Sequence, residues 1–279
     1  MLNLLLVIIC SSSIALILKQ SDVKKGNPVL LLTANYFTAS VISLIRLLTG
    51  EGSLSVQAFL FGCLLGISFF LSFFAFTRAI RSAGTALATV SSRLSVIIPV
   101  LFSVIIYSES PDTLKITGFI FTLVTIILFY FSIRRNSEGS LHLFDYLILL
   151  LLLLGIGFND FAFKIFNNWR PRAEGNFFLL SIFSSAFIFS FLYVFIKKIE
   201  FEAATIRRGL VLGIPNILAS VFLLGALSEL PAIIVFPAAN IGIILLTVTG
   251  AMLIFRERIN TAGWWAIVSG ITAVGLLSV

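Results

Sequence analysis

The sequence has few of the side chains that soluble enzymes use for chemistry. Its 279 residues include one histidine, His142, and two cysteines, Cys10 and Cys63, which lie in separate apolar runs. This scarcity argues against histidine-based catalysis, a metal site and a structural disulfide. Charged residues make up only 11% of the chain, whereas soluble domains average about a quarter. The composition therefore excludes an ordinary water-soluble domain.

Apolar residues, by contrast, are abundant and form long runs. They make up 59% of the chain, and the mean hydropathy is +1.13. A helix needs about 20 apolar residues to cross the bilayer core, and ten such segments fit this sequence. They are residues 2–18, 29–48, 58–80, 84–106, 113–133, 143–166, 177–196, 208–228, 231–255 and 261–279. The sequence predicts an all-α integral membrane protein with ten transmembrane helices.

The net charge is +7, and most of the basic residues lie at the ends of these segments. Membrane proteins commonly place basic residues there. Nucleic-acid binding is therefore not expected. One side of the membrane collects most of the lysines and arginines. These are Lys19, Lys24, Lys25, Arg78, Arg81, Arg134, Arg135, Lys197, Lys198, Arg207, Arg208, Arg256 and Arg258, against Arg46, Lys115, Lys164, Arg170 and Arg172 on the other side. The positive-inside rule then predicts that both termini face outward.

The second half of the chain repeats the first at a shift of about 147 residues. The segment 62–67 recurs as 209–214 with both glycines in place, so each half contains a Gly-x-x-x-Gly motif that lets helices approach closely. Each half also contains five predicted spans. An odd number of spans inserts the two copies upside down, and inverted repeats are the architecture of secondary transporters. The sequence thus predicts two inverted five-helix repeats, residues 1–135 and 136–279.

Two stretches carry a family resemblance, one in each half. The first runs from Ser92 through Pro99 to the segment 107–109 and Gly118, and the second runs through 237–240 and 255–259 to Gly263. Each reads as a span, a short turn with glutamate and a glycine-bearing span. This pattern resembles the drug/metabolite transporter superfamily, in its ten-span EamA-like branch.

The resemblance implies a central cavity lined by the first, third, fourth, sixth, eighth and ninth spans. Several members of this superfamily have both termini in the cytoplasm, which disagrees with the charge distribution of the present chain. We expect the orientation that the charges indicate.

Arg93 lies near the middle of the fourth predicted span, where a buried arginine costs several kcal/mol and should face water or a partner. Its counterpart at an offset of 147 is Asn240, in the ninth span. A guanidinium offers a fork of donors that matches a carboxylate or phosphate. We therefore predict that Arg93 and Asn240 bind an anionic group of a substrate. The alternative is a structural ion pair between helices.

Asp160 and Lys164 are four residues apart on the sixth span, close enough to pair on one helix face. Lys164 is either a substrate ligand or a side chain that extends toward the membrane interface. Asp160 lies deeper, and it is a candidate counter-ion of Arg93 or of Lys164. It is also a candidate proton-coupling site, because intramembrane carboxylates commonly relay protons.

Asn216, which follows Pro215 in the eighth span, and Asn35 in the second span are further candidates for substrate binding. Each is equally compatible with a role in helix packing. Glu109 and Glu257 lie at span ends. We expect them to stabilise a turn or the start of a neighbouring helix.

These observations favour a secondary carrier for a small anionic or zwitterionic metabolite, such as an amino acid, working by alternating access. The alternative is a flippase for lipids or lipid-linked head groups. No phosphate-binding loop of the type G-x-x-x-x-G-K-[ST] is present, so ATP hydrolysis is not expected. We expect no enzyme activity and no cofactor, with membrane lipid and the small-molecule substrate as partners. The chain is expected as a monomer or homodimer in the bacterial inner membrane.

Overall fold

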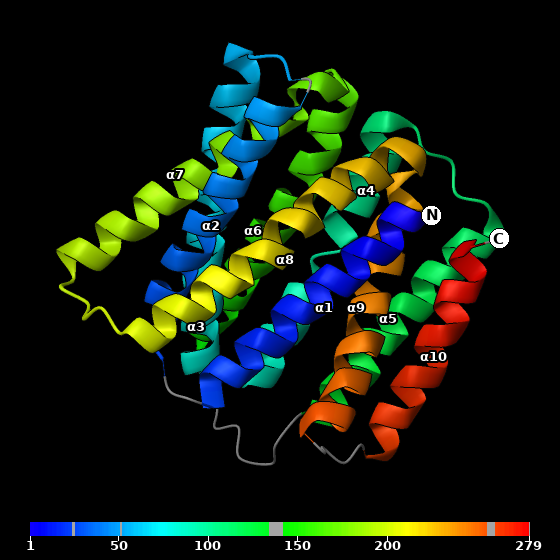
Figure 1. Cartoon of the computed structure of the whole chain (residues 1–279). Coiled ribbons are helices and arrows are strands. Elements are labelled where there is room, and N and C mark those ends of the chain that lie inside the picture. The colour runs from blue at the N-terminus through cyan, green and yellow to red at the C-terminus, as the bar shows by residue number, and fades with distance from the viewer. Residues whose placement is uncertain (24–25, 51, 134–141, 256–259, 279) are drawn as a thin grey trace. The chain divides into compact units, whose positions relative to one another are not determined.

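The computed structural model describes residues 1–23, 26–50, 52–133, 142–255 and 260–278 (Figure 1). The regular structure within these ranges is entirely helical, which confirms the prediction of an all-α chain. The helices are α1 (Leu2–Val23), α2 (Pro28–Thr49), α3 (Val56–Leu94), α4 (Ile97–Tyr107), α5 (Thr113–Ile133), α6 (Leu143–Trp169), the short 3-10 helix η1 (Arg172–Glu174), α7 (Gly175–Ile196), α8 (Ala203–Glu229), α9 (Ala232–Phe255) and α10 (Thr261–Ser278).

Eight of the described helical segments are long and apolar enough to cross a membrane. A shorter apolar stretch, Leu2–Leu18, adds to them. The third and fourth predicted spans fall together in one helical segment of 52 residues, Val56–Tyr107. The number of ten spans therefore stays a prediction, although the boundaries of the other segments agree closely with the helices.

Gly84 interrupts α3 at the junction predicted between the third and fourth spans. Its backbone has φ 86° and ψ 159°, which is not helical. A side chain would be strained at this φ, and glycine is the residue that adopts it freely. The chain therefore changes direction after Ala83, and a new helical stretch leads from there to Arg93.

A second interruption divides the fourth predicted span, which was expected to be continuous over 84–106. Helix α3 ends at Leu94 and α4 begins at Ile97. Pro99 is the physical reason, because it has no N–H to donate to the carbonyl of Ser95 and its ring crowds that carbonyl. The Ser95 carbonyl instead accepts from the N–H of Ile98 at 3.0 Å. Arg93 thus lies directly before a break in the helix.

The described helices form two compact units. The first unit contains residues 71–164 and 227–279, and the second contains residues 2–70 and 165–226. Each unit draws helices from both predicted repeats. This division concerns packing, and the repeat boundaries at 135 and 136 stay a prediction.

The second unit is held together by glycines at helix crossings. Helix α2 packs along α7, while α3 crosses α7 and α8 crosses α2 (Figure 1). A side chain on either glycine of the pair Gly62 and Gly66 would collide with α7, and one on Gly209 or Gly213 would collide with α2. The predicted close approach at both Gly-x-x-x-Gly motifs is therefore confirmed.

These glycine contacts are reciprocal between the two halves of the chain. Each contact joins one residue of the first half to one residue of the second. Adding 147 to the first residue number and subtracting 147 from the second gives another contact of the same kind. The matched contacts are Gly62 with Phe178 and Ser181, and Gly209 with Leu31 and Ala34; likewise Gly66 with Ile182 and Ser185, and Gly213 with Asn35 and Thr38. Reciprocal pairing of this kind characterises a two-fold interface.

The first unit packs corresponding helices against one another. Helix α5 lies along α10, and α4 lies against α9. The Ser269 hydroxyl donates to the carbonyl of Phe121 at 3.3 Å, and Thr125 donates to Ser269 at 3.0 Å. Small residues allow this proximity, since a side chain on Gly118 would meet Leu277. An apolar cluster of Ala79, Ala88, Ile148 and Leu152 joins α3 to α6 within the same unit.

Candidate functional site: a buried arginine in the first unit

Arg93 and Asn240, which occupy equivalent positions 147 residues apart, meet in the first unit. Nη1 of Arg93 donates a hydrogen bond to Oδ1 of Asn240 at 3.4 Å. Arg93 comes from the end of α3 and Asn240 from α9, which packs against α4. Because the bond is long, the amide is a weak partner for a full positive charge, which normally makes shorter contacts.

The guanidinium of Arg93 is only partly satisfied. Its Nε is buried and has no hydrogen-bond partner among the residues that the structure describes. A buried donor without an acceptor costs about 1–3 kcal/mol, and more when the group is charged. The site therefore holds a partly buried cation whose Nε donor is not used.

Both helices that carry these side chains have a proline nearby. Pro99 lies six residues after Arg93, beyond the break described above, and Pro237 lies inside α9, three residues before Asn240. Pro237 removes the amide that would otherwise bond to the carbonyl of Ile233. Irregular backbone at membrane depth is tolerated where it is buried in protein or lines a cavity. The polar pair thus lies near positions where a proline removes a backbone hydrogen bond from the helix.

Asp160 on α6 supplies the opposite charge. The two charges are near enough to influence one another, although the ion pairs and hydrogen bonds found among the described residues do not include one between Asp160 and Arg93. Its neighbour Asn159 donates to the Ser72 hydroxyl of α3 at 3.1 Å, and Gly157 packs against Ile98 of α4. These contacts hold α6 against the helices on either side of Arg93. The role of Asp160 as a counter-ion of Arg93 stays a prediction.

Lys164 forms its ion pair with a different residue. Its Nζ lies 2.6 Å from Oε1 of Glu109, and both side chains are nearly buried, at 8% and 11% exposure. The ammonium also lies 5.5 Å from the centre of the Tyr107 ring. The side chain is therefore enclosed by protein rather than extended toward an interface. Its proposed role as a substrate ligand stays a prediction.

Glu109 also caps a helix. Its two carboxylate oxygens accept hydrogen bonds from the backbone N–H groups of Ala232 and Ile233, each at 3.0 Å. These are the first residues of α9, where N–H groups lack partners within the helix and the helix dipole favours a negative charge. The prediction that Glu109 stabilises the start of a neighbouring helix is confirmed. Its counterpart Glu257 lies outside the described residues.

Asn35 and Asn216 meet in the second unit. Nδ2 of Asn216 on α8 donates to Oδ1 of Asn35 on α2 at 3.1 Å. Asn35 is fully buried, beside Tyr36, whose ring lies 6.4 Å from that of Phe183. Tyr36 and Phe183 are again 147 residues apart. This amide pair fits a packing role directly, and substrate contact at these two residues stays a prediction.

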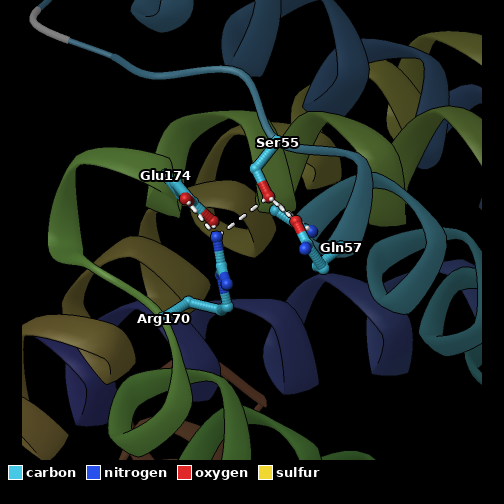
Figure 2. A network of polar contacts seen from close by, with 5 residues as sticks. Ser55, Gln57, Arg170 and Glu174 are labelled. Atoms are coloured by element: carbon cyan, nitrogen blue, oxygen red, sulfur yellow. Dashed lines mark hydrogen bonds and ion pairs between the residues drawn. The ribbon is translucent and has the colours of Figure 1, made fainter.

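One polar network was not anticipated from the sequence. Arg170 makes two hydrogen bonds to Glu174, at 2.6 and 2.7 Å, and a third to the Ser55 hydroxyl at 3.1 Å (Figure 2). Ser55 in turn donates to Gln57 at 2.9 Å. The hydrogen bonds to Glu174 raise the pKa of Arg170. The four-residue spacing of Arg170 and Glu174 was the available signal, and the network braces the connection before α3 against the connection before α7.

In the part of the chain that the structure describes, no group of three or more histidine, cysteine, aspartate or glutamate side chains is arranged to hold a metal ion. What the site offers is a guanidinium, an amide and a carboxylate in apolar surroundings. Such a set can bind an acid group or exchange a proton.

Comparison with known proteins agrees with this description. The chain is 26% identical over 287 aligned residues to an uncharacterized protein of Haemophilus influenzae, covering 98% of this chain and 96% of that one. A crystal structure of another protein superposes with a TM-score of 0.81 at 15% identity, covering 100% of this chain and 97% of the other, which shows a shared fold. Residues 1–131 match the model of the EamA-like transporter family. The chain is thus a multi-pass membrane protein whose residues 1–131 are similar to the EamA-like transporter family, which agrees with the resemblance to the drug/metabolite transporter superfamily.

Proposed function

We propose that this protein is a secondary-active carrier that moves a small anionic or zwitterionic metabolite, such as an amino acid, across the bacterial inner membrane. Two inverted five-helix repeats would move against each other and open a site built on Arg93, Asn240 and Asp160 first to one side of the membrane and then to the other. The hydrogen bond between Arg93 and Asn240 carries the proposal, because it joins a partly buried cation to the equivalent position of the other predicted repeat.

The reciprocal contacts support the repeat architecture. The glycine crossings of the second unit pair residues with exchanged halves, and Arg93 with Asn240 is a pair of direct counterparts in the first unit. The segment Val56–Tyr107 has 52 residues, enough for two crossings of about 20 residues each, and Gly84 divides it. With α1 as a further crossing, this gives ten spans, five in each repeat.

The chemistry of the site supports an acid group as the part of the cargo that is recognised. Arg93 has a buried Nε to spare, and a guanidinium holds a carboxylate or phosphate through two parallel hydrogen bonds. Ionisable side chains inside the membrane usually mark the pathway of a substrate or ion. The counterpart of Arg93 is a neutral amide, so the two halves of the site differ, as an asymmetric cargo requires.

A ligand screen on the purified protein tests the proposal. The proteinogenic amino acids and short mono- and dicarboxylic acids are added in turn, and the unfolding temperature is measured, since a ligand of the native state raises it. At least one acid should stabilise the native protein and be taken up by proteoliposomes. Arg93→Ala should abolish both effects, whereas Arg81→Ala, on the exposed part of the same helix α3, should preserve them.

Two outcomes would overturn the proposal. One is undiminished binding by a well-folded Arg93→Ala variant. The other is a panel without any binder, combined with scrambling of phospholipid in liposomes that contain the protein. The second outcome would point to the flippase alternative.

A further inference from the structure

We propose that the ion pair of Lys164 with Glu109 is a latch whose opening parts α6 from α4, so that the cargo reaches Arg93 from the far end of α4. This inference rests on the proposed function and adds the path of entry to it. The contacts between α6 and α4, and the different ways in which the two halves of α6 are held, carry the argument.

Helices α6 and α4 touch along one seam within the first unit. At its start, just past the break between α3 and α4, Gly157 packs against Ile98. Further along, the ring of Phe161 lies 5.2 Å from that of Phe102 and 6.2 Å from that of Tyr107. Residue numbers rise in the same direction along both helices, so the seam leads from the start of α4 to its end.

A pair of charges closes the far end of this seam. Nζ of Lys164 on α6 lies 2.6 Å from Oε1 of Glu109 and 5.5 Å from the centre of the Tyr107 ring. Replacement of a buried ion pair by apolar residues is often neutral or stabilising. Stability alone therefore gives little reason for two charges beside aromatic rings. What the pair supplies is a contact that water can take over when the helices separate.

The two charges of the latch are held unequally. Glu109 also accepts hydrogen bonds from the N–H groups of Ala232 and Ile233, each at 3.0 Å, where the dipole of α9 favours a negative charge. Lys164 has a flexible apolar stem, and lysine side chains of this kind extend along apolar surface to place the ammonium in water. When the pair separates, Glu109 therefore stays with α9 and Lys164 leaves with α6.

The first half of α6 is fixed by apolar packing, unlike the latched second half. Ile148 and Leu152 belong to the same buried cluster as Ala88 of α3. Gly155 and Gly157 lie between the two halves, and glycine weakens the interior of a helix more than any residue except proline. Bending at these glycines moves the second half of α6 away from α4 while the first half stays packed.

A single thiol on the seam reports whether it opens. Ser103 of α4 is fully buried, and its hydroxyl has no hydrogen-bond partner among the described residues, so that replacement by cysteine removes no such bond. At 100° per residue, Ser103 lies between Phe102 and Tyr107 on the surface of α4, and both of these rings contact Phe161. The two native cysteines are first replaced by alanine.

The probe is 2-sulfonatoethyl methanethiosulfonate, a small anionic thiol reagent that does not cross membranes. It is added to right-side-out and to inside-out membrane vesicles, and the rate of its reaction with the Ser103→Cys reporter is measured. Ser110→Cys, exposed in the connection after α4, identifies the side of the membrane on which the latch lies. The reporter should react from that side only, and slowly while the latch is intact.

Breaking the ion pair from either partner should open the seam. Glu109→Gln and Lys164→Met each leave a nearly buried charge unpaired, and this disfavours the closed seam so strongly that the reporter should react roughly tenfold faster or more. The combined variant Glu109→Gln/Lys164→Met contains neither charge, and its reporter should again react slowly. Ala88→Cys, in the apolar cluster of the first half of α6, should stay unreactive in every background.

Several outcomes would overturn the latch. One is an equally slow reaction in the parent protein and both single variants, and another is a fast reaction that persists in the combined variant. Reaction of Ala88→Cys together with the reporter would show that the unit unfolds rather than opens. The measurement needs no cargo. A ligand screen without any binder therefore overturns the proposed function while the reporter still scores the opening, and a binder with an unresponsive reporter leaves the carrier standing without this latch.

Discussion

Arg93 donates a hydrogen bond to Asn240, the residue that occupies its own position in the other half of the chain. If each residue is replaced by its equivalent in the other half, the same pair of positions results. The same holds for Tyr36 with Phe183 in the second unit and, at an offset of 148, for Phe121 with Ser269 in the first. Of these self-matched pairs, only the first combines a charged side chain with a neutral amide.

Removal of Lys164 should destabilise the protein strongly. Lys164→Met leaves the nearly buried Glu109 carboxylate without its cation, and breaking a buried ion pair from one side costs roughly 3–5 kcal/mol. The unfolding temperature in detergent should fall accordingly. Lys115→Met is the control, because the Asp112 carboxylate of that pair is half exposed and such pairs contribute about 0–1 kcal/mol.

A second substitution distinguishes loss of charge balance from loss of packing. Glu109→Gln in the Lys164→Met background keeps an oxygen that can accept from the amides of Ala232 and Ile233 while it removes the unpaired charge. Part of the lost stability should return. If the double variant is less stable than Lys164→Met alone, the ion pair is not the cause.

The reciprocal glycines should be equally sensitive in both halves. Gly66→Val pushes a side chain into the backbone of α7, and Gly213→Val does the same to α2. Overpacking of this kind costs typically about 1–3 kcal/mol, so both variants should lose stability by similar amounts. Gly275→Ala adds a methyl group where nothing lies within 4 Å and should not lower the unfolding temperature, since alanine is the better helix former. A loss in only one half would contradict the equivalence of the two crossings.

Acid should weaken the start of α5. Hydrogen bonds from the side chain and the backbone N–H of Lys115 lower the pKa of Asp112 below its ordinary value of 3.8. A carboxyl whose pKa is lower in the native state than in the unfolded state stabilises the protein above the unfolded pKa, and this contribution disappears as the pH falls through the native one. Thermal unfolding followed from neutral pH to below pH 3.8 should therefore show a smaller acid-induced loss in Asp112→Asn than in the wild-type protein.

The hydrogen bonds of Arg170, which join the connection before α3 to the connection before α7, depend on the shape of the guanidinium. Arg170→Lys keeps the charge but cannot form the two parallel bonds to Glu174 together with the bond to Ser55. We expect faster cleavage by an added protease at the connection between α6 and α7. Ser55→Ala removes one of these bonds and should have a smaller effect. Equal protease resistance of Arg170→Lys and the wild-type protein would show that charge alone is sufficient.

The helix positions could be read from the sequence because apolar runs and their polar ends are local properties. The sequence also placed the junction between the third and fourth spans next to Gly84, and the repeat gave Arg93 and Asn240 equivalent positions, although their contact was not predicted. The break between Leu94 and Ile97 was not predicted, although Pro99 was visible. A proline inside a span either bends or breaks a helix, and the packing around it decides which.

The partner of Lys164 illustrates the limit of local reasoning. Spacing along the helix favoured Asp160, four residues away, and the actual partner Glu109 is 55 positions distant in the sequence. The Arg170 network was missed for the same reason, since Ser55 reaches it from another connection. Contacts between side chains of separate helices depend on how those helices pack, and a single sequence records that packing only where a repeat reveals it.

The glycine crossings have a consequence for how such a chain tolerates change. The glycine crossings of the second unit occur twice with the halves exchanged, and contacts related in this way resemble those at the two-fold interface of a dimer. In a true dimer any substitution appears in both subunits, and an arginine facing its own copy would repel it. The two halves of this chain differ in sequence, so one can carry an amide where the other carries a charge. This difference allows Arg93 to donate to Asn240 instead of facing a second arginine.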